Sequence, residues 1–257
     1  MRFPLRITAE LMKTRIAQRL RLGRVARPVQ FVDSAEILLS DSSHPISHEK
    51  IREITDSGSP AIWIGGSEPL LHPGIAHLVR AITGSGHFVF LETDGTALRR
   101  RIHEFQPESR LFLTVRIEPS GPRTSGGVQA GASQLAVEGI RAARLSGFSI
   151  CVYVRVTADT NLCETAELLS LARSLDVDGI VIPPSNGETN TSSQDAEALV
   201  RKTEDARKMI GSKWWESFSR LVEPIVSGNR HVARSGGETS LVLEQKSHAN
   251  EEGVRVA

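Results

Sequence analysis

The sequence predicts an α/β protein in which parallel strands alternate with helices along most of the chain. Six short segments rich in apolar and β-branched residues lie within residues 28–184, and helical patterns separate them. Parallel strands need long crossover connections, so this alternation indicates successive βα units. Six units are too few for a complete eight-stranded barrel, which leaves an open partial barrel or a doubly wound sheet. The expected strands are "VQFVD" (29–33), "AIWIG" (61–65), "HFVFLET" (87–93), "LFLTVRIE" (111–118), "FSICVYVRVT" (148–157) and "DGIVIP" (178–183).

The connecting segments have the spacing of apolar residues expected for helices. Three of them end in Ser-Gly or Gly-Ser-Gly, and glycine at this position commonly closes a helix in the left-handed conformation. The expected helices cover residues 47–58, 73–86, 97–105, 132–147 and 163–175, and two more follow at about 194–210 and 213–227. The chain therefore divides into a basic N-terminal helix (1–27), the strand–helix region (28–184), a C-terminal helical extension (185–227) and a tail expected to be disordered (228–257).

The composition excludes several classes of function. The chain has 257 residues, and its net charge of +1 is too small for a generic polyanion binder, so we expect no nucleic-acid partner. Its two cysteines, Cys151 and Cys163, cannot build a disulfide framework and favour a reducing compartment. No apolar run approaches the roughly 20 residues of a membrane span, and the N-terminus lacks the apolar core of a secretory signal. These features predict a cytoplasmic protein.

Residues 1–27 differ from the rest of the chain in charge. They contain eight Arg or Lys residues and one acid, Glu10. Met12, Ile16 and Leu20 repeat at helical spacing, Leu11 lies beside them, and basic residues cover the other faces. This pattern is typical of a helix that lies on an anionic membrane surface. A solvated helix packed on the edge of the domain fits the same pattern, so both interpretations remain open.

The second and third strands end in turns suited to a ligand. In parallel α/β folds, ligands bind at the carboxyl ends of the strands. The second strand ends in Gly65-Gly66-Ser67-Glu68-Pro69, where glycines expose backbone groups and Glu68 supplies an acceptor for a cationic amine. The third strand ends in Glu92-Thr93-Asp94-Gly95, which predicts a turn before a helix. The alternative for this turn is simple helix capping, since Thr and Asp are good capping residues.

The fourth and fifth strands each carry polar residues on one alternating face. Thr114, Arg116 and Glu118 share a face of the fourth strand, and Cys151, Tyr153 and Arg155 share a face of the fifth. Strands covered on both faces by apolar layers would be continuously apolar, so this pattern indicates a cavity. The two arginines are suited to a carboxylate or a phosphate. An ion pair with Glu118 or between strands is the alternative.

Taken together, these segments resemble the radical S-adenosylmethionine (radical SAM) superfamily. "IGGSEPLLHPGI" is similar to its Gly-Gly-Glu-Pro segment, which ends the second strand and contacts the methionine amino group through backbone carbonyls. "LETDGTAL" is similar to its Thr-Asn-Gly turn, with Asp94 in place of Asn, and "GIRAARLSGFSICVYVRVT" and "SLDVDGIVIPP" resemble later segments. The resemblance runs in order from about Pro28 to Pro184. It implies a partial (β/α)6, TIM-like barrel of parallel strands, and within the superfamily it is nearest to the enzymes that attach adenosyl to hopene in hopanoid synthesis.

The sequence departs from this family after the first strand. The family's Cys-x3-Cys-x2-Cys loop lies there, but residues 33–50 read "DSAEILLSDSSHPISHEK" and contain no cysteine. A four-iron cluster of this family needs three thiolates, so we expect no iron–sulfur cluster. Asp41, His44 and His48 are weak candidates for another metal, because Pro45 interrupts any helix between the two histidines. We therefore expect no metal site.

Three hypotheses for function follow. The first is a degenerate radical-SAM-fold protein that binds S-adenosylmethionine or a related small ligand in a binding or regulatory role, including as partner of an active relative. The second is an enzyme that acts in the same pocket on an adenosyl or lipid-like substrate by another mechanism. The third is a non-catalytic membrane-surface module that depends on residues 1–27. The residues predicted to bind the ligand are Gly65, Gly66, Ser67, Glu68, Pro69, Thr93, Asp94, Gly95, Arg116, Glu118 and Arg155, and no catalytic residue is assigned.

Three aromatic or imidazole residues outside these turns need an interpretation. Trp214 and Trp215 lie in the C-terminal helical region and are expected to cover the open barrel edge as part of the core. If they were exposed, they would instead indicate a partner or a membrane contact. His72, which follows the Glu-Pro segment, is expected to pack or cap rather than to act as a base.

Overall fold

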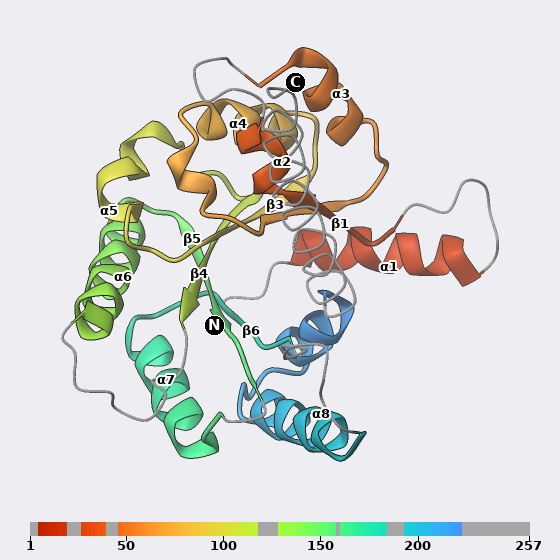
Figure 1. Cartoon of the computed structure of the whole chain (residues 1–257). Helices are drawn as coiled ribbons and strands as arrows, with labels where there is room; N and C mark the ends of the chain where they lie inside the picture. Colours follow the sequence, from red (N-terminus) through yellow and green to blue (C-terminus); the bar gives the residue numbers. More distant parts are fainter. Residues whose placement is uncertain are drawn as a thin grey trace, which may run out of the picture.

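The computed structural model describes residues 5–19, 27–39, 46–117, 128–157, 160–183 and 193–222, and its core is a sheet of six parallel strands. The strands lie side by side in the order in which they occur in the chain (Figure 1). A doubly wound sheet would reverse its strand order at a switch point, so the sequential order leaves the partial barrel. The strands are β1 (Val29–Asp33), β2 (Ala61–Gly65), β3 (Phe88–Thr93), β4 (Leu111–Ile117), β5 (Ser149–Val154) and β6 (Gly179–Val181). The predicted strands are confirmed to within a few residues at each end.

Helices cover the outside of the curved sheet, and others lie where β1 and β6 leave the ring open (Figure 1). In that figure, α5, α6 and α7 lie along the outside, and α1 lies on the open side. A last helical segment, residues 213–222, follows α8. The helices are α1 (Leu5–Arg19), α2 (Ser34–Leu39), α3 (His48–Thr55), α4 (Ile75–Gly84), α5 (Leu98–Arg101), α6 (Val128–Leu145), α7 (Leu162–Ser174) and α8 (Ser193–Lys208), with short 3-10 turns at η1 (Pro69–Leu71) and η2 (Ile102–Glu104).

Aromatic rings fill the interior of the partial barrel. Phe90 on β3 stacks on Trp63 of β2 at 5.6 Å between ring centroids and on Phe112 of β4 at 4.9 Å. Phe218, from the 213–222 helix, reaches Phe90 at 4.8 Å, so this helix contributes to the interior of the barrel. Trp215 is 1% exposed and packs so closely on β6 that a Cβ at Gly179 would lie 2.1 Å from its ring. The expectation that the tryptophans belong to the core is confirmed for Trp215.

The sheet ends at β6 because side chains occupy the next backbone groups. The N–H of Ile182 donates to Ser219 Oγ at 3.1 Å, and the Ile182 carbonyl accepts from Arg207 Nε at 2.8 Å. These are groups that a seventh strand would otherwise bind. Arg207 is only 2% exposed, and its guanidinium also pairs with Glu204 at 2.7 Å. The helices after the barrel therefore close one edge of it.

Two helices differ from the sequence-based expectation. Helix α2 begins directly after β1, in a region interpreted only as a connecting loop, because Asp33 Oδ1 caps it by accepting from the N–H of Ala35 at 2.8 Å. Helix α6 begins at Val128, a few residues before the expected start at 132. The predicted tail, residues 228–257, and the candidate metal residues Asp41 and His44 lie outside the described residues.

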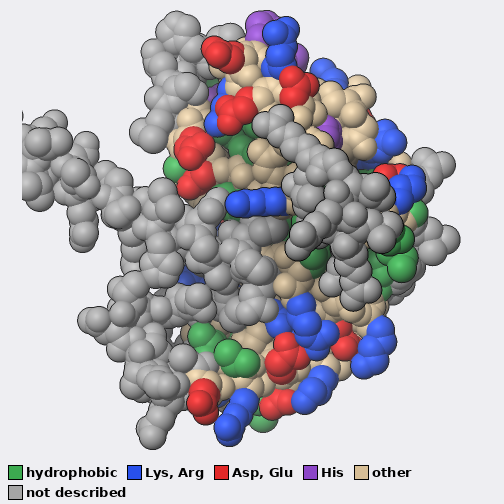
Figure 2. Space-filling view, turned by 90° about the vertical axis from the view of Figure 1, so that its right-hand side faces the viewer, with side chains coloured by type: hydrophobic (Ala, Val, Ile, Leu, Met, Phe, Trp, Pro, Cys, Tyr) green, Lys and Arg blue, Asp and Glu red, His purple; other side chains and the backbone are tan. Residues whose placement is uncertain are grey.

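Helix α1 buries only one of the apolar residues that the sequence pattern singled out, Leu11, together with Ile7. Ile7 and Leu11 are buried, whereas Met12 and Ile16 are 60% and 54% exposed. Leu20 lies outside the described residues. Within the described part of the chain, no helix combines the length and the apolar character that crossing a bilayer requires. On the face drawn in Figure 2, acidic and basic side chains are interspersed rather than gathered into one patch of a single sign.

Candidate functional site

Glu68 joins the two turns that follow β2 and β3. Its Oε1 accepts hydrogen bonds from Thr93 Oγ1 at 2.7 Å and from the N–H of Leu70 at 3.1 Å, and its Oε2 accepts from the N–H of Asp94 at 2.7 Å. The two turns that the sequence predicted as ligand-binding are therefore tied together at the carboxyl ends of the strands. A carboxylate has about four acceptor positions, so this one keeps room for one more donor.

The glycine turn after β2 also packs tightly against the end of β1. Gly66 has a φ of +99°, and a Cβ at this position would lie 2.4 Å from Asp33 Oδ1. The carbonyl of Ser67 accepts a hydrogen bond from Ser34 Oγ at 2.7 Å. Glycine at position 66 is thus required both by backbone conformation and by the close approach of Asp33. Pro69 is buried at the start of η1, directly after Glu68.

The turn after β3 has the capping contacts that the sequence offered as an alternative. Asp94 Oδ1 accepts from the N–H of Thr96 at 2.8 Å and from its hydroxyl at 2.7 Å, and Thr93 Oγ1 accepts from the N–H of Gly95 at 3.0 Å. Gly95 has a φ of +81°, and a Cβ there would lie 3.0 Å from the backbone of Ala136 in α6. These contacts hold the turn in one conformation, whether or not a ligand uses it.

A buried ion pair lies inside the barrel near the same end of the strands. Glu92 on β3 is 2% exposed; its Oε1 accepts from Arg116 Nη1 at 3.1 Å and its Oε2 accepts from Trp63 Nε1 at 2.9 Å. The predicted alternative of an ion pair between strands is therefore present, with Glu92 as the acid. Residues paired across parallel strands share a face, and the register pairs Glu92 with Thr114 and Arg116 with Tyr153. The polar face predicted for β4 and β5 is thus continued by β3.

Two predicted site residues remain, Arg155 and Glu118, and the structure describes only the first. Arg155 follows β5 and is half-buried. Glu118 lies outside the described residues, so its predicted role stays a prediction. The sequence pattern places Glu92 in a turn and Trp63 within the second strand, and gives neither a role in the site. The alternation of Phe88, Phe90 and Glu92 along β3 could have placed this acid in the interior.

Burial changes the proton affinity of several groups. Burial raises the pKa of Glu68 above its ordinary value, and the hydrogen bonds from Asp94 and Thr93 oppose that shift. Burial and the nearby charge of Arg101 lower the pKa of His72, which is 1% exposed and accepts from the N–H of Gly74 through Nδ1 at 2.9 Å. His72 is therefore packed in the interior with one local hydrogen bond, and its lowered pKa disfavours the charged form. Complete burial raises the pKa of the Cys151 thiol well above its usual range, so it is unsuited to serve as a thiolate.

The cysteines do not fit an iron–sulfur cluster. Such a cluster in the radical SAM family needs three thiolates, and the chain has two cysteines. Cys151 is buried in β5, whereas Cys163 is exposed in the first turn of α7. Among the described residues, no group of three or more His, Cys, Asp or Glu side chains is placed to hold a metal ion.

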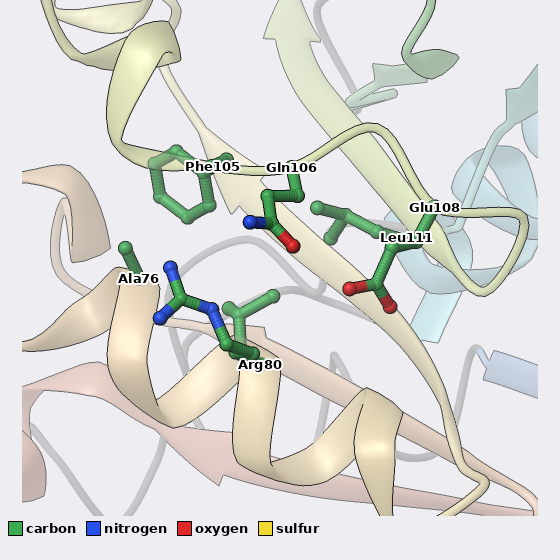
Figure 3. Close-up of a pocket in the computed structure, with 7 residues that line it drawn as sticks. Ala76, Arg80, Phe105, Gln106, Glu108 and Leu111 are labelled. Carbon is green, nitrogen blue, oxygen red and sulfur yellow. The ribbon is translucent and has the colours of Figure 1, made fainter.

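A small hollow lies beside the start of β4, between α4 and the preceding loop (Figure 3). Arg80, Gln106 and Glu108 point toward it, and Phe105 and Leu111 supply apolar walls. It has room for little more than about one water molecule. None of the predicted site residues lines it.

Comparisons with known proteins give a likeness of overall architecture. No protein-family profile and no curated protein matches the sequence. Among solved structures, archaeal TYW1 is 15% identical, with a TM-score of 0.42 over 63% of this chain and 54% of that one. SuiB of Streptococcus suis bound to S-adenosylmethionine is 12% identical, with a TM-score of 0.49 over 75% and 51%. The HMG-CoA lyase of Brucella melitensis is 15% identical, with a TM-score of 0.42 over 70% and 69%. The chain thus spans about half the length of the TYW1 and SuiB structures.

Proposed function

We propose that this chain is a radical-SAM-like protein that lacks the cluster ligands and binds S-adenosylmethionine, or a related ligand with an amino-acid group, in a binding or regulatory role. The observation that carries the proposal is Glu68, whose carboxylate holds the turns after β2 and β3 together at the carboxyl ends of the strands. The resemblance of both turns to radical SAM segments supports it. A regulatory role includes acting as partner of an active relative. The basic N-terminal segment is a feature shared with the adenosyl-hopene branch of the superfamily.

The charges at this end of the barrel suit a zwitterion. Glu68 and the carbonyls of the glycine turn accept hydrogen bonds, as an ammonium group requires. Arg116 offers N–H donors, as a carboxylate requires. Both side chains lie at the end of β3. Arg116 pairs with Glu92, and Glu68 binds the next two residues, Thr93 and Asp94. An amino-acid group carries both complementary charges.

Calorimetry tests this proposal directly. We expect S-adenosylmethionine to bind the wild-type chain. Glu68→Ala should weaken binding by about 5- to 100-fold, because the turns lose their common acceptor, which costs about 1–3 kcal/mol. Asp205→Ala is the matched control, since Asp205 pairs with Lys208 on the exposed face of α8. No binding to the wild-type chain at millimolar ligand would contradict the proposal. A stoichiometric iron–sulfur cluster after anaerobic reconstitution would contradict the non-radical part of it.

A second candidate function is contact with a membrane surface through α1. Met12 and Ile16 are exposed large apolar side chains on a helix whose sequence segment is strongly basic. We expect the full chain to float with anionic liposomes, and Met12→Ser combined with Ile16→Ser to reduce its recovery severalfold. Leu145→Ser is the control, because Leu145 is 90% exposed but lies at the end of α6. Equal recovery of all three proteins would remove this function.

A further inference from the structure

Glu92 is a buried charge at the end of β3, beside the two turns that Glu68 joins. Its carboxylate lies inside the barrel at 2% exposure, where an ionised group needs a partner and hydrogen bonds. Arg116 supplies the charge at 3.1 Å, and Trp63 supplies a hydrogen bond at 2.9 Å to the other carboxylate oxygen. The two oxygens are thus engaged from two different strands, which fixes the plane of the carboxylate.

Arg116 uses little of its donor capacity. A guanidinium carries five N–H donors, and the contact with Glu92 involves Nη1 alone. The side chain of Arg116 is 24% exposed, compared with 2% for Glu92, so it extends from the buried acid toward solvent. An arginine held at one nitrogen, with its other donors unbound by the described residues, can present a planar fork to a ligand.

The support behind Glu92 is rigid. Trp63 is fully buried and stacked on Phe90 with an angle of 9° between the ring planes, so its indole N–H cannot easily turn away. Gly65 leaves the space that the hydrogen bond needs, since a Cβ there would lie 2.6 Å from Glu92 Oε2 and 3.1 Å from Trp63 Nε1. The carboxylate is therefore held in one place by packing as well as by charge.

We propose that Glu92 is a positioning residue that orients Arg116 to bind the carboxylate of the ligand, with Trp63 and Gly65 supporting it. This inference rests on the proposed function and names the ligand group that its site recognises. Glu92 already balances one unit of charge, so the pair favours a monoanion such as a carboxylate over a dianionic phosphate. A planar carboxylate also matches the two parallel N–H groups of a guanidinium.

The test compares S-adenosylmethionine with its decarboxylated analogue, which lacks only the carboxylate. For the wild-type chain we expect the dissociation constant of the analogue to be about 10- to 100-fold higher, the usual range for a charge-assisted hydrogen bond. Glu92→Gln should bring this ratio close to one, because Arg116 loses its anchor. Trp63→Phe, which keeps the ion pair, should lower the ratio less. A purely structural role would weaken both ligands equally and leave the ratio unchanged.

Two further variants keep the outcome decisive. Arg116→Lys keeps the charge but removes the fork, so it should lose most of the ratio even if Glu92→Gln fails to fold. Asp178→Asn alters a buried acid–arginine pair outside the site and should leave the ratio as in wild type. If the wild-type chain binds both ligands equally, or Glu92→Gln and Arg116→Lys keep the full ratio, the inference is wrong and the proposed function stands. If neither ligand binds the wild-type chain, both fail.

Discussion

Each end of the strands carries a buried acid paired with an arginine, but the two arginines are engaged to different extents. At the amino end, Arg144 binds Asp178 at 2.8 Å and Asp176 at 2.7 Å, and Asp178 also accepts from the N–H of Ile150 at 2.9 Å. At the carboxyl end, Arg116 binds Glu92 through one nitrogen. The arrangement around Arg144 joins α6 to the loop before β6 and to the start of β5, so a structural role accounts for all of these contacts. The pair of Arg116 and Glu92 leaves donors on an arginine where ligands of parallel α/β proteins bind.

Removing Arg144 should have the largest effect on stability. Arg144→Ala leaves Asp178, whose side chain is 8% exposed, as a buried charge without its partner. Breaking a pair of this kind costs about 3 kcal/mol or more, which a shift of the urea midpoint at constant m-value would report. Ligand binding should be unchanged in the molecules that remain folded. A loss of binding at full stability would contradict the division between the two ends.

Adding a methyl group at Gly65 should have a smaller effect on stability and a clear effect on the site. Gly65→Ala places a Cβ 2.6 Å from Glu92 Oε2, so either the Trp63 hydrogen bond breaks or the strand shifts. We expect a loss of about 1–3 kcal/mol in the free energy of unfolding, as for other overpacked cores. Gly84→Ala is the matched control, because a Cβ there meets nothing within 4 Å at the end of α4. Equal stability of the two variants would show that Glu92 can move freely.

Much of this fold could be predicted from the sequence because strand–helix alternation is a local pattern. The six strands follow from apolar runs separated by helices, but this pattern fits both a partial barrel and a doubly wound sheet, and the strand order in the structure decides between them. The sequence offered an ion pair between strands, but its acidic partner, Glu92, could not be predicted in the same way. Glu92 and Arg116 are 24 residues apart, and only the register of β3 and β4 brings them onto one face. The burial of Ile7 instead of Ile16 in α1 likewise depends on what the helix meets.

Glu204 and Glu68 are two acids with opposite pKa shifts, and we expect their effects on the pH dependence of stability to be the smallest of those predicted here. Glu204 lies beside Arg207 and Arg220. The hydrogen bonds from Arg220 lower the pKa of Glu204 most, and the hydrogen bond and charge of Arg207 lower it further, to about 2. Its folded value lies below the unfolded 4.5, so the stability it contributes is complete above pH 4.5 and is lost as pH falls toward 2. The pKa of Glu68 is raised by burial, so the ionised side chain costs stability as pH rises from 4.5 through its folded value.

Urea unfolding of wild type, Glu204→Gln and Glu68→Gln between about pH 3 and pH 7 would measure both contributions, since glutamine does not titrate in this range. The stability of wild type relative to Glu204→Gln should fall on acidification, whereas its stability relative to Glu68→Gln should rise. The opposite signs arise because two arginines favour the charged form of Glu204, while neutral donors offset only part of the burial of Glu68. Slopes of the same sign would mean that a cation also lies beside Glu68, and the zwitterion site would then need a different acceptor for its ammonium group.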